Sequence, residues 1–183
     1  MSGTLVLHNR VRAVVVNSRC WRRLFATLLE KLLGKDEFDL GIYFVGAPEM
    51  TRLNETFLHH AGPTDVIAFN YMEPAAAPVK ARTQPVGKKP ARALTSAATM
   101  LHGEIFICVD EAFVQGRRFR TAWQSELARY LIHGVLHLLG HDDQHPADRR
   151  KMKRVENRML AELSRLFPLS KLACHHPRAS RKS

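Results

Sequence analysis

The segment LIHGVLHLLGHDDQH, residues 131–145, combines histidines, a glycine and an aspartate at a spacing that suits metal binding. His133 and His137 are four residues apart, so on a helix both rings project from one face. Gly140 stands where helices commonly end in a left-handed residue, and the turn would bring Asp143 back toward the imidazoles. Three protein ligands leave a fourth position of a zinc ion open to water, as in catalytic rather than structural sites.

The pattern His-x3-His-x2-Gly-x2-Asp shares its spacing with the metzincin metallopeptidases but lacks their base. In those enzymes a glutamate directly after the first histidine is the general base, and here that position is Gly134. The residues therefore favour metal-assisted hydrolysis of something other than a peptide. His141 and Asp142 compete with Asp143 for the third ligand position, and His145 is expected at the surface.

The elements that must position these residues follow from hydrophobic periodicity and from capping residues. Strands are predicted at residues 5–16 (with a break near Asn9), 40–46, 64–71 and 101–109, and helices at 18–33, 48–57, 111–116, 125–139 and from 146 to 167. Alternating strands and helices, followed by two closing helices, favour an α+β fold. We expect a single domain with a small, mainly four-stranded sheet packed by about five helices and the metal site at the end of a helix.

Two segments are expected outside this fold. Residues 72–100 hold four prolines and eight alanines without apolar periodicity, and they predict a flexible insertion into a domain of residues 1–167. Residues 168–183 predict a disordered basic tail. Each segment carries a net charge of +4, so they account for +8 of the formal charge of +11. Flexible basic arms favour a nucleic acid partner, although they say little about sequence selectivity.

The cysteines and the hydropathy pattern indicate a cytoplasmic protein. Cys20, Cys108 and Cys174 are too few and too scattered for a disulfide framework. No stretch has the pattern of a signal peptide or the length of a membrane-spanning helix, so no membrane partner is expected. Cys174, His175 and His176 lack the spacing of a structural zinc site.

Three stretches of the chain resemble one known family. They are LNETFLHHAGPTDVIAF (53–69), LHGEIFICVDEA (101–112) and HGVLHLLGHDD (133–143). In these stretches, and over roughly residues 10 to 167, the chain is similar to the YbeY-type endoribonucleases, also called rRNA maturation factors. The resemblance implies a zinc-dependent, single-strand-specific endoribonuclease with one zinc ion per chain, acting on ribosomal RNA in maturation and ribosome quality control, with the ribosome as a further partner.

The chain departs from this family at two positions. Asp143 stands where the family has a histidine as third ligand, and aspartate is a competent zinc ligand. Leu58 stands where the family has an arginine that is assigned to substrate handling. His59 and His60 lie next to it and are candidates to share that task.

Further polar residues have both a functional and an ordinary interpretation. Arg117 and Arg118, with Arg120, form a basic cluster that either contacts phosphate or is a solvated face. Glu126 lies seven residues before His133, where it either orients a ligand histidine or pairs with an arginine. Thr64 and Asp65 either line the cleft or, in the case of Asp65, cap a turn.

The sequence leaves the chemistry and two rival functions open. Activated water can attack phosphorus directly, or a ribose 2′-hydroxyl can be deprotonated for internal attack, and no side chain in the motif is an obvious separate base. One rival is a non-catalytic ribosome assembly factor with a structural metal. The other is a zinc peptidase. Two histidines and one carboxylate also suit iron in an oxygenase, although the resemblance gives this little support.

Overall fold

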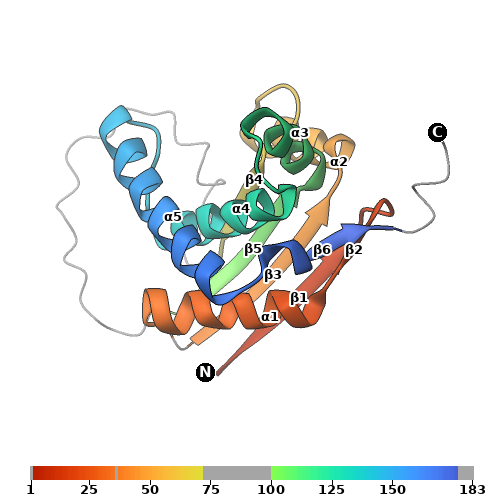
Figure 1. Ribbon diagram of the computed structural model, residues 1–183. Helices are drawn as coiled ribbons and strands as arrows, with labels where there is room; N and C mark the ends of the chain where they lie inside the picture. The colour runs from red at the N-terminus through yellow and green to blue at the C-terminus, as the bar shows by residue number, and fades with distance from the viewer. Residues whose placement is uncertain (1, 36, 72–99, 177–183) are drawn as a thin grey trace, which may run out of the picture.

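The computed structural model describes residues 2–35, 37–71 and 100–176 as an α+β domain built on one four-stranded sheet (Figure 1). The strands lie in the order β1 (Ser2–Asn9), β3 (Glu37–Val45), β5 (Leu101–Cys108), β4 (Val66–Asn70). The first three run parallel, and β4 pairs antiparallel with β5. The predicted fold class is confirmed.

In the described part of the chain, five α-helices surround this sheet. They are α1 (Ser18–Thr27), α2 (Ala47–Leu53), α3 (Val109–Phe119), α4 (Trp123–Leu138) and α5 (Pro146–Leu166). Wider helical turns extend α1 as η1 (Leu28–Leu33) and α2 as η2 (Asn54–Leu58). Helix α4 contacts β4, β5, α3 and α5, which places the predicted metal segment at the centre of the domain.

Strand alternation divides the core into two clusters on opposite faces of the sheet. In β5, Ile105 and Ile107 belong to the larger cluster, whereas Phe106 and Cys108 belong to the smaller one. Successive side chains of a strand point to opposite faces. The larger cluster contains the apolar residues of α1, α4 and α5, and the smaller one contains Met50 of α2 and Leu58 of η2. The metal helix and Leu58 therefore face opposite sides of the sheet.

The predicted strand at residues 5–16 is broken, as the sequence suggested, near Asn9. The Asn9 side chain donates to the Val14 carbonyl and accepts from the Val11 amide. After this turn the chain forms the short strand β2 (Val14–Val16). Asn17 caps α1 through its side-chain oxygen, which accepts from the Cys20 amide. Helix α3 continues past Gly116 and ends at Arg120 in a left-handed conformation.

The prediction of a disordered tail from residue 168 is wrong for residues 169–175. These residues form a single 3-10 turn, η4 (Leu169–Lys171), and strand β6 (Ala173–His175), which pairs antiparallel with β2. Leu172 is buried, and its carbonyl accepts a hydrogen bond from the indole nitrogen of Trp21. The ring of His175 stacks on Phe113. The segment thus packs into the core cluster that contains α1, and the sequence-based argument from charge missed its apolar anchors.

Two predictions concern residues outside the described ranges. The insertion predicted at residues 72–100 falls outside them except for Met100, and so do residues 177–183 of the predicted tail. Among the helices that the structure describes, none is long and apolar enough to span a membrane.

Candidate metal centre

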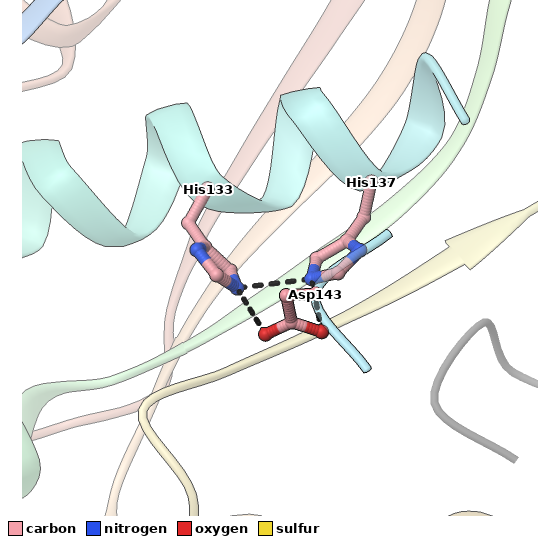
Figure 2. Close-up of side chains that lie close together, drawn as sticks. All are labelled: His133, His137 and Asp143. Atoms are coloured by element: carbon pink, nitrogen blue, oxygen red, sulfur yellow. Dashed lines mark hydrogen bonds and ion pairs between the residues drawn. The ribbon is translucent and has the colours of Figure 1, made fainter. Parts of the chain in front are cut away.

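His133, His137 and Asp143 converge at the C-terminal end of α4 (Figure 2). The Nε2 atoms of the two histidines lie 2.9 Å apart. One oxygen of Asp143 lies 3.8 Å from Nε2 of His133, and the other lies 3.9 Å from Nε2 of His137. The three residues chosen from the sequence therefore form one group of donor atoms.

The turn at Gly140 brings Asp143 to the histidines. Gly140 has a φ of +85° and follows the last residues of α4. Its amide donates to the His137 carbonyl, and the amide of His141 donates to the Leu136 carbonyl. This pair of bonds is the Schellman arrangement of a helix end, which reverses the chain direction. The amide of Gln144 then donates to the Asp142 carboxylate, and the side chain of Arg149 donates to the Asp143 carbonyl. These two hydrogen bonds hold the loop.

Hydrogen bonds fix the tautomers of both histidines. Nδ1 of His137 lies 3.1 Å from the carbonyl oxygen of His141, and a carbonyl can only accept, so this nitrogen carries the proton. Nδ1 of His133 lies 3.1 Å from the carboxylate of Glu156 and is likewise the donor. In their neutral forms, both imidazoles therefore present an Nε2 lone pair toward each other and toward the Asp143 carboxylate.

A cation fits this set of donors. Lone pairs of two imidazoles and one carboxylate repel each other unless a positive charge lies between them, and this is the ligand chemistry of zinc. A tetrahedral zinc ion with bonds of ~2.0–2.1 Å holds neighbouring ligand atoms roughly 3.4 Å apart. The distances of 2.9, 3.8 and 3.9 Å bracket that value. The residues present thus suit a mononuclear metal site.

A buried polar network supports His133 from α5. Glu156, only 7% exposed, accepts from His133 through one oxygen and from Arg129 at 2.7 Å through the other. Arg129 also donates to Glu126 and to Asn157. Burial opposes ionisation of the Glu156 carboxyl, but the hydrogen bonds from His133 and Arg129 outweigh it, so its pKa lies below the usual range.

Glu156 was not identified from the sequence, whereas Glu126 was. Glu126 is 5% exposed and accepts from Arg129 and from the Thr121 hydroxyl, which is the ion-pair interpretation given above. Hydrogen bonds link Glu126 to His133 indirectly, by way of Arg129 and Glu156. The signal for Glu156 was present: it lies between Met152 and Met159 on the apolar face of α5, where a carboxylate needs partners.

The metal group opens into a cavity of about 740 Å³. His133, Asp143 and Glu156 line it, as do Thr64 and Asp65, which the sequence suggested as cleft residues. The Asp65 carboxylate also accepts from the Val66 amide and from the Thr64 hydroxyl. The cavity wall includes Tyr130, whose hydroxyl has no hydrogen-bond partner among the described residues and whose pKa is raised by burial.

The predicted substrate residues do not line this cavity, and neither does Leu58. Leu58 is 4% exposed and packs in the smaller core cluster. His59 and His60, which follow it, are exposed, and so are Arg117 and Arg118 at the end of α3. A role of His59, His60, Arg117 and Arg118 in binding RNA stays a prediction.

The competing third ligands lie outside the donor group. His141 contributes its backbone carbonyl to His137, and burial together with Lys151 lowers the pKa of its ring. Asp142 and His145 are exposed.

Packing explains why a glycine stands at position 134, where zinc peptidases have their glutamate base. A Cβ atom at this position would lie 2.7 Å from Cγ2 of Ile105 and 3.3 Å from Cγ2 of Val66. The position thus faces strands β4 and β5 rather than the cavity, and no glutamate can act there without a shift of the helix.

Comparisons with known proteins point to one family. The sequence profile of the family described as "Endoribonuclease YbeY" matches residues 7–164. A protein named endoribonuclease YbeY from Chlorobium luteolum is 29% identical over 88% of this chain and 98% of its own length. One of the same name from Parabacteroides distasonis is 32% identical over 71% of this chain and 75% of its own length.

A solved structure supports the fold. The solution structure of TM1509 from Thermotoga maritima matches with a TM-score of 0.52 at 21% identity, covering 91% of this chain and 95% of that one. The family profile spans the sheet, the helices and the whole metal group, and this chain therefore belongs to the YbeY endoribonuclease family.

Proposed function

We propose that this protein is a zinc-dependent endoribonuclease that cleaves single-stranded RNA and acts in ribosomal RNA maturation and ribosome quality control. The observation that carries the proposal is the convergence of two tautomer-fixed imidazoles and one carboxylate beside a cavity that His133 and Asp143 line. Membership of the family and the names of its relatives supply the substrate class.

The chain's own residues have distinct tasks in this proposal. His133, His137 and Asp143 would hold the ion, which would supply Lewis acidity toward water and toward the charge of a phosphate. The Glu156 carboxylate and the His141 carbonyl hold the Nδ1 protons, so both Nε2 atoms remain available as ligands. Arg129 balances the charge of Glu156 and of Glu126 inside the protein.

A second candidate function is a non-catalytic ribosome assembly factor that uses the metal for structure. Leu58 favours this alternative, because a buried apolar side chain stands where the resemblance implies an arginine for substrate handling. A peptidase is disfavoured because Gly134 faces the sheet.

The test follows end-labelled single-stranded RNA and an unfolded peptide substrate with wild type and His137→Ala. Wild type should cleave the RNA in a zinc-dependent way and leave the peptide intact, and His137→Ala should lose both zinc and cleavage. Equal RNA cleavage by the two proteins would reject the nuclease and favour the assembly factor. Peptide cleavage that depends on His137 would favour the peptidase.

A further inference from the structure

Helix α5 has two faces of opposite character. Met152, Glu156, Met159 and Leu163 are buried against the domain. The exposed side of its first three turns carries a dense group of cations: Arg149, Arg150, Lys151, Lys153 and Arg154. Within residues 2–35, 37–71 and 100–176, none of these five forms an ion pair with an acid. Apart from the hydrogen bond of Arg149 to the Asp143 carbonyl, their charge is thus not used to hold the described fold together.

Part of this basic face continues into the metal cavity. Arg149 and Lys153 line the cavity that contains His133 and Asp143. Lys153 also lines a second hollow of about 390 Å³, together with Arg150, Arg154 and Asn157. Because Lys153 and Asn157 border both hollows, the basic surface leads without interruption from the outside of α5 to the metal group.

Another part of the cavity lining, the acidic wall, carries negative charge. Asp65 and Glu111 belong to it, and the cation Arg129 of α4 is already engaged by Glu126, Glu156 and Asn157. A polyanion is repelled from the acidic wall and attracted to the α5 wall. The electrostatics therefore select one approach to the metal group.

We propose that single-stranded RNA docks along the exposed face of α5, with phosphates bound by Arg150, Lys153 and Arg154, and enters the metal cavity past Lys153 and Arg149. The inference rests on the proposed function for its choice of RNA as the polyanion. It moves the principal RNA contact from the predicted flexible arms to a helix of the folded domain.

The test compares two double substitutions on the same helix. Arg150→Gln with Arg154→Gln removes two proposed phosphate contacts. Arg158→Gln with Arg165→Gln removes the same charge from residues that line neither hollow. All four side chains are exposed, and glutamine is close to arginine in helix propensity, so both proteins should fold and retain zinc.

Binding is measured by fluorescence anisotropy with a labelled single-stranded RNA whose 2′-hydroxyls are methylated, and gels confirm that it stays intact. Two lost phosphate contacts should make the plot of log affinity against log salt shallower by about 1.4 and weaken binding roughly tenfold at low salt. The control pair should keep the slope of wild type. Arg150→Lys with Arg154→Lys should also keep it, since the charges remain.

The outcomes separate this inference from the proposed function. If both double variants lose the same affinity and slope while wild type binds RNA, the α5 surface is not the docking site and the nuclease proposal stands. If wild type binds no RNA at any salt concentration, both are rejected.

Discussion

The metal group and the Leu58 segment are the two parts that the family resemblance assigns to the reaction, and they differ in this chain. His133, His137 and Asp143 converge even though Asp143 stands where the resemblance implies a histidine. Leu58 has instead become part of a core cluster with Met50 and Ile67 on the other face of the sheet. The ligand atoms of one ion must be positioned to within a fraction of an ångström. A long cationic side chain, in contrast, can reach a phosphate from many backbone positions. The metal geometry is therefore harder to relocate than the phosphate contact.

The largest effect that tests this comparison is expected for Asp143→Ala. It removes the only carboxylate of the donor group, so zinc affinity should fall by more than the ~10–100-fold typical of losing an outer partner. His141→Ala is the matched control, because its ring lies outside the group and its carbonyl remains. Zinc per chain is measured after dialysis against a mild chelator. Retention in the Asp143 variant with loss in the His141 variant would reverse the assignment.

A smaller effect is expected for Glu156→Gln, which keeps the shape of the side chain but removes its charge. The amide can still accept from His133, yet it no longer favours the Nδ1 proton as a carboxylate does, and it leaves Arg129 with one acid fewer. Zinc affinity should fall about 10-fold in Glu156→Gln and roughly 100-fold in Glu156→Ala. Competition with a chromogenic chelator measures this. Affinity equal to wild type in both variants would show that His133 needs no partner.

The smallest effect on zinc is expected for Leu58→Arg, although this change restores the residue of the resembled family. The position is 4% exposed among apolar side chains, so the substitution should cost about 2–4 kcal/mol of stability and leave zinc content unchanged. Leu58→Met should cost less than about 1.5 kcal/mol. Urea denaturation compares the two. A stable arginine variant with faster RNA cleavage would show that position 58 reaches the substrate.

The sequence predicted those parts of the molecule whose cause is local. His133, His137, Gly140 and Asp143 lie in one short segment, so helical periodicity and a helix-ending glycine were enough to place them together. The sheet was predictable as a set of strands, although its order depends on pairings between segments far apart in the chain.

Features that depend on distant partners escaped prediction. Glu156 reaches His133 from the next helix, and its partner could not be read from spacing. Strand β6 has only three residues and its neighbourhood is basic, yet burial of Leu169 and Leu172 and the indole of Trp21 hold it in place. Net charge described the composition of that segment but not its packing.

The bonds between α4 and α5 gather around the metal group, and this has a consequence for local unfolding. Glu156 and Arg149 tie α5 to His133 and to the loop at Asp143. An ion bound there stabilises only conformations in which these ties are closed. Chelation should thus speed amide hydrogen exchange in the first turns of α5 while β3 and β5 exchange at their former rates. The metal would then hold in place the helix that we propose as the RNA docking surface.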